Sequence, residues 1–165
     1  MPQPPGSPTA PEPERGSIRR LFGRAFGRRP SPDPTAVRAV PPNAVIIVTY
    51  EPSIDGDPDP GEVIWGWVPY EDDPTRGKDR PMVVIGRCEG RLVGVPLTSR
   101  QRRRDMQVSV GAGTWDGQRR ESYARVDHAI EMATGTYRRE GAVLQRDRFD
   151  AVVAGVSRYR HVQRA

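Results

Sequence analysis

The sequence has 165 residues, of which 35% are hydrophobic, 18 are Pro and 17 are Gly, a composition that allows one small domain with a polar tail. No apolar run approaches the roughly 18 residues of a membrane-spanning helix, and the first residues lack the apolar core of a secretory signal. The single cysteine, Cys88, excludes an intramolecular disulfide and a Cys-rich zinc site. We therefore expect a cytoplasmic protein that uses no metal and no other cofactor.

The net charge is +5, and every cation except Lys78 is Arg. Arginine suits bidentate contact with phosphate and stacking on bases. A coding bias toward GC-rich codons would produce the same excess, so the Arg content alone leaves nucleic-acid binding open.

The N-terminal third is unlike the rest of the chain, because 14 of the 18 Pro lie in the first 60 residues. We predict a disordered Pro/Arg-rich tail over residues 1–42 and one folded domain over residues 43–165. Within the tail, residues 17–29 (SIRRLFGRAFGRR) form a basic amphipathic segment. Anionic lipid, RNA and a partner protein all fit such a segment, and so does a solvated tail.

The most informative stretch is residues 61–99, which predicts strands over residues 62–68, 82–85 and 92–97. Residues 70–79 between the first two carry many charges, a Pro and a Gly, and we predict a loop there. A hairpin turn at residues 88–91 would pair the second and third strands. That pairing brings Arg80 and Thr98 to the same end of the ladder, which is our main structural inference.

The remaining segments predict further short strands and one helix. Residues 51–61 are acidic, but the Gly and Glu positions of a calcium loop counted from Asp55 fall on Pro60 and Gly66, so a solvated loop fits better. The predicted helix has apolar residues on one face and should cover one opening or face of a small barrel. The expected elements are strands at residues 45–50, 106–110, 122–126, 129–132 and 136–144, and a helix at residues 145–160.

Such short strands followed by a helix indicate a mainly β protein, a small SH3-like barrel. Three segments, GEVIW at 61–65, RPMVVI at 80–85 and VPLTS at 95–99, together with REGAVL at 139–144, resemble the MazF/PemK (Kid) family of toxins of type II toxin–antitoxin systems. The resemblance covers about residues 61–160. It implies the barrel of the MazF/PemK/CcdB-type plasmid-maintenance toxins and a metal-independent, sequence-selective endoribonuclease. The reaction that the resemblance implies is attack of the 2′-OH on the adjacent phosphate of single-stranded RNA, which would leave 2′,3′-cyclic phosphate and 5′-OH ends.

The resemblance also assigns candidate site residues. Arg80 and Thr98 match the catalytic pair, and a guanidinium with a hydroxyl suits a transition state that gathers negative charge. No His is expected to act as base, and His128 and Cys88 are interpreted as structural. The aromatic residues Trp65, Trp67 and Tyr70 are interpreted as packing residues rather than as platforms for bases. Candidates for a base or positioning group are Glu71, Asp72 and Asp73, and candidates for RNA binding are Lys78, Ser99, Arg100, Arg102, Arg103 and Arg104.

The expected partners are single-stranded RNA (mRNA), a cognate antitoxin and a second copy of the chain, and the same resemblance implies DNA binding. Two other functions fit the sequence. One is a catalytically silent binding module of the same fold for protein or nucleic acid. The other is a toxin that poisons topoisomerase, although that branch is not expected to need the Arg80 and Thr98 pair.

Overall fold

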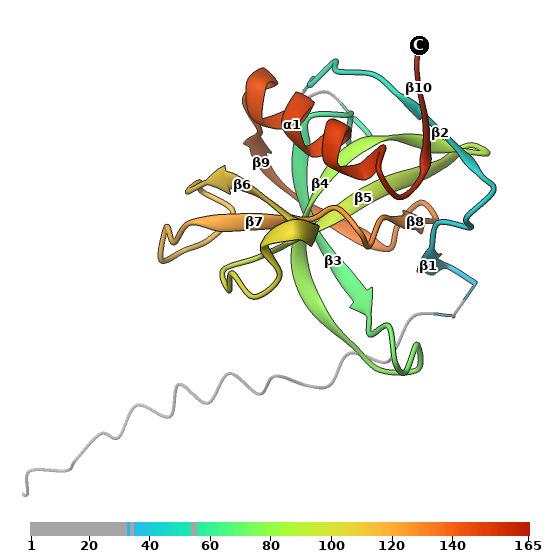
Figure 1. The fold of residues 1–165 in the computed structure, drawn as a ribbon, viewed down its shortest axis with the longest axis horizontal. Helices are drawn as coiled ribbons and strands as arrows, with labels where there is room; N and C mark the ends of the chain where they lie inside the picture. The colour runs from blue at the N-terminus through green and yellow to red at the C-terminus, as the bar shows by residue number, and fades with distance from the viewer. Residues whose placement is uncertain (1–32, 34, 54–55) are drawn as a thin grey trace, which may run out of the picture.

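The computed structural model describes residues 33, 35–53 and 56–165 of the chain, so most of the predicted tail, including the segment 17–29, lies outside the described residues. The described part is mainly β with one α-helix near the C-terminus (Figure 1). Its elements are β1 (Val37–Ala39), β2 (Val45–Val48), β3 (Glu62–Pro69), β4 (Gly77–Cys88), β5 (Arg91–Thr98), the 3₁₀ turn η1 (Arg104–Met106), β6 (Gln107–Gly111), β7 (Ser122–Arg125), β8 (Ile130–Met132), β9 (Tyr137–Val143), α1 (Arg146–Val156) and β10 (His161–Arg164).

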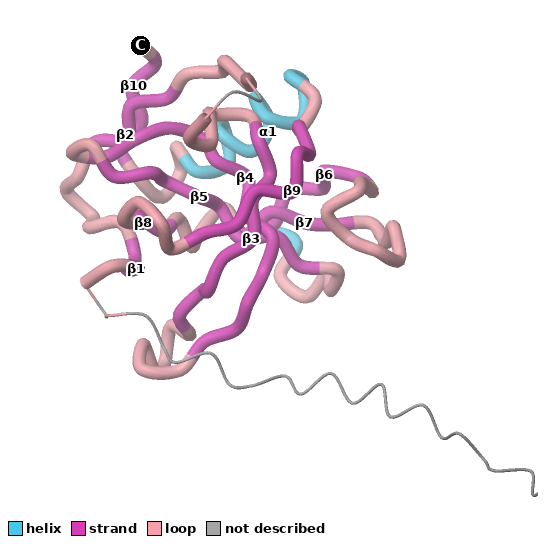
Figure 2. The backbone as a smooth tube through the Cα atoms, turned by 180° about the vertical axis from the view of Figure 1, so that it is seen from behind, coloured by secondary structure: helices cyan, strands magenta, loops and turns pink. Residues whose placement is uncertain are grey.

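The described strands form an open, branched sheet. Its main hydrogen-bonded path runs β1-β8-β5-β4-β2-β10. Two branches leave this path: β3 pairs with β4 and with β9, and β7 pairs with β5 and with β6. The two ends of this path, β1 and β10, do not pair with each other (Figure 2). The predicted closed barrel is therefore not observed, although the mainly β class with a C-terminal helix is confirmed.

The β3–β4 hairpin corrects the predicted loop over residues 70–79. β4 begins at Gly77, so Lys78 and Asp79 are strand residues that pair with Val68 and Trp67. The charged residues of this segment suggest a loop, but they belong to a part of the β3–β4 ribbon that extends beyond the body of the sheet (Figure 1). Polar residues are tolerated in a strand where its side chains meet solvent. The turn itself is confined to residues 70–76.

The core lies on both faces of the central sheet, and β4 shows this most clearly. Met82 and Val84 belong to one buried cluster, whereas Val83 and Ile85 belong to the other. This alternation follows from the two-residue repeat of a strand, and it explains why a strand buried on both sides reads as a continuous apolar run. The central strands are thus packed on both faces of the sheet.

Helix α1 covers the larger cluster. Its buried Phe149 packs edge-on against the ring of Tyr50, with ring centroids 4.9 Å apart. The helix is shorter than predicted: it ends at Val156, and the chain then turns into β10 instead of continuing to residue 160. In the described part of the chain, no helix has the length and apolarity needed to cross a membrane.

Two short strands at the chain's ends were not predicted. β1 pairs antiparallel with β8, and β10 pairs in parallel with β2. The three residues of β1 are too few to carry a strand pattern, yet Val37 is buried and Arg38 contacts the buried Glu131 at 2.5 Å. The folded body therefore begins before residue 43, the predicted domain boundary.

Candidate functional site

The site forms where β4 and β5 diverge. Their ladder pairs Met82 with Pro96, and two further residues along each strand lead to Arg80 and Thr98. Beyond Pro96, β5 changes partner and pairs with β7, so that Thr98 lies opposite Tyr123. Arg80 and Thr98 consequently lie on the wall of one pocket, at the same end of the ladder, as the strand pairing predicts.

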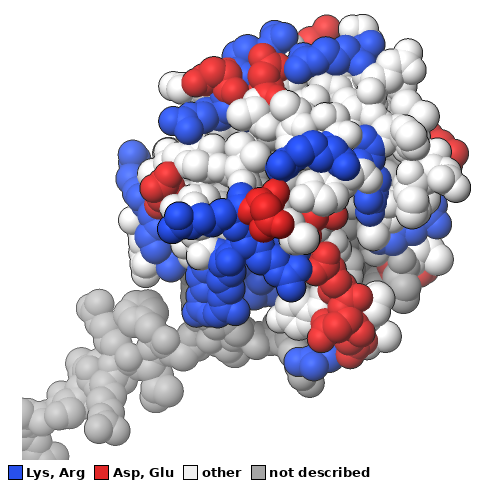
Figure 3. All heavy atoms as spheres, in the orientation of Figure 1, with Lys and Arg blue, Asp and Glu red and all other residues white. Residues whose placement is uncertain are grey.

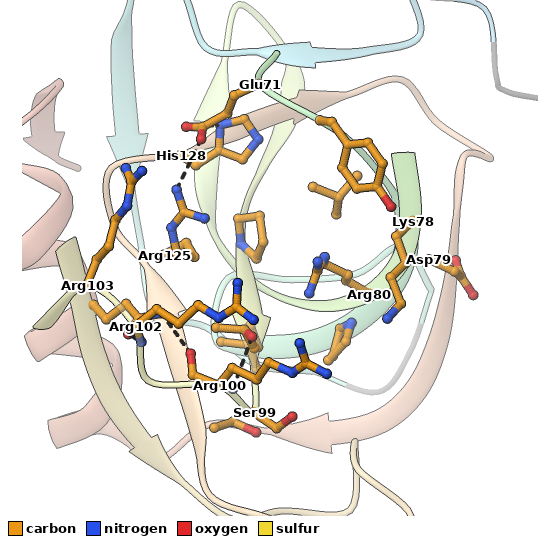
Figure 4. A pocket seen from close by; sticks show the side chains of 18 of the residues that line it. Glu71, Lys78, Asp79, Arg80, Ser99, Arg100, Arg102, Arg103, Arg125 and His128 are labelled. Atoms are coloured by element: carbon orange, nitrogen blue, oxygen red, sulfur yellow. Dashed lines mark hydrogen bonds and ion pairs between the residues drawn. The ribbon is translucent and has the colours of Figure 1, made fainter. Parts of the chain in front are cut away.

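That pocket has a volume of about 750 Å³ and is lined by β3, β4, β5, β6, β7 and the loops between them (Figure 4). Among the described residues that line it, seven are Lys or Arg and four are Asp or Glu. Three of the acids are paired with Arg side chains, since Asp79 contacts Arg138 at 2.7 Å, Asp116 contacts Arg120 at 2.8 Å and Glu71 contacts Arg125 at 3.3 Å. The pocket is therefore cationic and suits an anionic ligand. Lys and Arg side chains also gather on this face of the molecular surface (Figure 3).

Arg80 is half-buried and points into this pocket (Figure 4). Burial lowers the pKa of its guanidinium, and the positive charges of Arg125 and Arg100 lower it further, against an opposing effect of Tyr70. Among the described residues, none forms a hydrogen bond or ion pair with the Arg80 side chain. An incoming anion would thus meet a guanidinium whose donors are all available.

Thr98 offers a hydroxyl to the same pocket. Its Oγ1 accepts a hydrogen bond from the backbone N–H of Arg100 at 3.2 Å. Because that bond uses a lone pair of the oxygen, the hydroxyl hydrogen remains available for donation to a ligand.

The cationic loop after β5 is held by a glutamine that the sequence did not single out. Gln107 on β6 accepts a hydrogen bond from the Arg102 backbone N–H and donates one to the Arg100 carbonyl, both at 3.1 Å. These bonds satisfy the loop backbone and leave the side chains exposed. The pocket lining includes the predicted RNA-binding residues Lys78, Ser99, Arg100, Arg102 and Arg103. Arg104 lies in η1 and does not line the pocket.

The three candidate acids separate into two groups. Glu71 and Asp72 line the pocket, whereas Asp73 does not. The Asp73 carboxylate accepts hydrogen bonds from the hydroxyl (2.5 Å) and backbone N–H (3.1 Å) of Thr75, and the hydroxyl bond is the main reason that the pKa of Asp73 is lowered. Asp73 therefore shapes the turn between β3 and β4.

Two basic residues beside Glu71 also line the pocket, and the sequence analysis did not select them as site residues. Arg125, at the end of β7, donates to both oxygens of Asp127 at 2.8–2.9 Å and to Glu71 at 3.3 Å. His128, interpreted from sequence as structural, lies beside them, with its Nδ1 3.5 Å from Glu71 and its Nε2 3.4 Å from the Pro69 carbonyl. Burial lowers the pKa of His128, although the Glu71 carboxylate opposes this effect. No local pattern points to either residue, because only the β5–β7 pairing brings them to Thr98.

Cofactor use is not decided by this arrangement. Within residues 33, 35–53 and 56–165, no three His, Cys, Asp or Glu side chains are grouped so that they could hold a metal ion. Cys88 is buried, away from the pocket lining. Independence from metal stays a prediction from the family resemblance.

The sequence of the chain matches a known family of proteins. A model of the family described as "PemK-like, MazF-like toxin of type II toxin-antitoxin system" matches residues 59–159, which is more than half of the chain. The chain therefore belongs to this family, and the resemblance seen over residues 61–160 is confirmed. Strands β1, β2 and β10 lie outside the matched range.

The chain is also similar to solved structures. MazF (Form-I) from Deinococcus radiodurans is 19% identical with a TM-score of 0.51, over 63% of this chain and 96% of that one. MazE-MazF from the same organism is 18% identical in Form-III (TM-score 0.45, 61% of this chain and 94% of that one) and 19% identical in Form-II (TM-score 0.46, 63% and 96%). No curated protein matches the chain. At these identities the likeness to MazF concerns the fold alone.

Proposed function

We propose that this protein is a metal-independent, sequence-selective endoribonuclease that cleaves single-stranded RNA and acts as the toxin of a type II toxin–antitoxin system. The observation that carries the proposal is the half-buried Arg80, which has no anionic partner among the described residues and shares a cationic pocket with the Thr98 hydroxyl. A phosphodiester is an anion that accepts hydrogen bonds from both groups. Membership of the toxin family makes RNA the substrate to test first.

The proposed reaction is an internal transesterification. The ribose 2′-oxygen loses its proton and forms a bond to the adjacent phosphorus, and the bond from phosphorus to the 5′-oxygen breaks. The leaving 5′-oxygen takes up a proton, so the products carry a 2′,3′-cyclic phosphate and a 5′-OH. Arg80 and Thr98 donate hydrogen bonds to the non-bridging oxygens, whose negative charge is greatest in the transition state.

Asp72 is the candidate for the base or for positioning the 2′-OH. It lines the pocket, and no described residue forms a hydrogen bond or ion pair with its side chain. A carboxylate in this state is available to accept the proton of the 2′-OH. Asp73 is excluded from this proposal because its carboxylate is engaged by Thr75.

RNA binding beyond the reacting phosphate is assigned to the exposed Arg100, Arg102, Arg103 and Lys78, with Ser99 beside them. Their exposure suits contacts with the phosphate backbone, which are strong at low salt and weaken as salt rises. Neutralisation by an antitoxin, assembly into a homodimer, DNA binding and a cytoplasmic site of action belong to this proposal on the strength of the family alone.

The test is incubation of the purified protein with a long single-stranded RNA in EDTA, followed by mapping and chemical analysis of the fragment ends. We expect discrete cuts with 5′-OH and 2′,3′-cyclic phosphate ends. Intact RNA from a folded protein, across several unrelated RNA sequences, would instead favour a binding module of the same fold.

A further inference from the structure

One acidic side chain of the pocket, that of Glu71, is directed toward basic side chains of the same pocket. Glu71 lies at the start of the β3–β4 turn and reaches across to the segment that follows β7 (Figure 4). One carboxylate oxygen is 3.3 Å from the Arg125 Nη2, and the other is 3.5 Å from the His128 Nδ1. The Glu71 carboxylate thus contacts two basic groups in the pocket where we propose that an RNA phosphodiester binds.

The contacts of Glu71 are weaker than those of the other acid on Arg125. Asp127 is 10% exposed and receives two hydrogen bonds from Arg125, at 2.8 and 2.9 Å. Glu71 is 52% exposed and receives one long bond, so solvent and salt screen its interaction. If Glu71 leaves, Asp127 still holds the guanidinium in place. Glu71 is therefore the exchangeable anion and Asp127 the permanent one.

The turn that carries Glu71 is internally bonded. Tyr70 donates its backbone N–H to the Arg76 carbonyl at 2.9 Å, and Arg76 donates to the Asp73 carbonyl at 3.0 Å. These bonds allow the turn to keep its shape when the contact across the pocket opens. Breaking the contacts of Glu71 would make Arg125 and His128 accessible to a ligand without unfolding the β3–β4 hairpin.

We propose that Glu71 is an internal competitor of the substrate: it latches the β3–β4 turn to Arg125 and His128, and an RNA phosphate must displace it to occupy this side of the pocket. The inference rests on the proposed function, because it names RNA as the displacing anion. It assigns Glu71 to the control of affinity rather than to proton transfer.

The latch depends on pH through His128. The groups that face its ring are the Glu71 carboxylate, the Pro69 carbonyl, Arg125 and Asp127. Protonation of His128 adds a positive charge beside Glu71 and strengthens the latch, so the latch is tightest at acidic pH. Deprotonation weakens it as the pH rises.

The experiment measures binding of a fluorescent single-stranded RNA with 2′-O-methyl groups throughout, which blocks cleavage and separates affinity from catalysis. The proteins are the full-length wild type, Glu71→Gln and Asp79→Asn. The last is a matched control, since Asp79 is another partly exposed carboxylate of the pocket, has no role in the proposed reaction, and is paired with Arg138 rather than with Arg125 or His128. Fluorescence anisotropy is recorded between about pH 5 and 8, on both sides of the ordinary His pKa of about 6.5.

We expect Glu71→Gln to bind about two- to fivefold more tightly than the wild type, the range that exposed ion pairs support, with the largest gain at the acidic end. Asp79→Asn should gain clearly less. A second measurement needs no RNA: in NMR titrations, the His128 pKa should fall in Glu71→Gln and stay unchanged in Asp79→Asn. Equal gains in both variants, no gain, or an unchanged His128 pKa would overturn the latch. If the wild type binds no RNA at any pH, the proposed function fails instead. The NMR titration then still tests the Glu71–His128 contact, because it needs no RNA.

Discussion

Replacing Arg80 with alanine should remove most of the cleavage activity and leave the fold intact. The expectation follows from the surroundings of the side chain, which forms no hydrogen bond or ion pair with any described residue. Its removal therefore leaves no buried carboxylate without a partner, and it also removes repulsion from Arg100 and Arg125, both of which lower the pKa of Arg80. We expect the free energy of unfolding to change by less than about 1 kcal/mol.

The effect on catalysis should be much larger. Loss of one fixed donor to a developing oxyanion typically costs about 100- to 1000-fold in rate, or about 2.7–4 kcal/mol of transition-state stabilisation. Arg80→Lys keeps the positive charge but loses the planar fork of donors, so its rate should lie between those of the wild type and Arg80→Ala.

The assay is single-turnover cleavage of a single-stranded RNA in EDTA with enzyme in excess, paired with urea unfolding of the same samples. Thr98→Ala serves as a second variant, because it removes the other proposed donor at the same phosphate. A folded Arg80→Ala protein that cleaves within about threefold of the wild-type rate would refute the role of Arg80, since a factor of three is well below the effect of one such donor.

Three other substitutions test the surroundings of the site. Arg125→Ala should cost about 1–3 kcal/mol of stability in urea unfolding, because it leaves the Asp127 carboxylate without its bidentate partner; a loss no greater than that of Arg80→Ala would contradict this. His128 has its pKa lowered by burial, so the unfolded chain binds protons more readily and stability should fall as the pH drops below 6.5. His128→Gln should flatten that part of the stability curve, and an unchanged curve would argue against the burial of a neutral ring. Phe149→Ala should cost about 3–5 kcal/mol through the cavity it leaves under α1, and a loss under about 1 kcal/mol would show that the helix is not anchored there.

The central strands could be predicted from the sequence because their pattern is local. Residues 82–85 are buried on both sides of the sheet and form an unbroken apolar run. β1 and β10 could not be predicted, because each is very short and forms only through a partner far away in the sequence. The start of β4 was missed for a different reason: Lys78 is exposed and Asp79 is only partly buried on a projecting ribbon, so burial does not select apolar residues there.

The site was predictable only in part. Arg80 and Thr98 come together through one hairpin, and a hairpin register can be inferred from sequence. Arg125 and His128 reach the same pocket through the pairing of β5 with β7, two strands separated by the whole β6 segment. No sequence pattern around Arg125 and His128 predicts that pairing. Arg104 shows the converse, since it lies in η1 outside the pocket lining although it directly follows Arg102 and Arg103, and its role in RNA binding stays a prediction.

The most direct test of the central claim is cleavage of an RNA in which one ribose lacks its 2′-OH. The cut site is first mapped on unmodified RNA in EDTA, and a deoxyribose is then placed on the 5′ side of that bond. The proposed reaction needs this hydroxyl as the nucleophile, so we predict that cleavage at that bond stops while binding and cleavage elsewhere continue. Continued cleavage at the deoxyribose position would contradict attack by the 2′-OH in the pocket of Arg80 and Thr98.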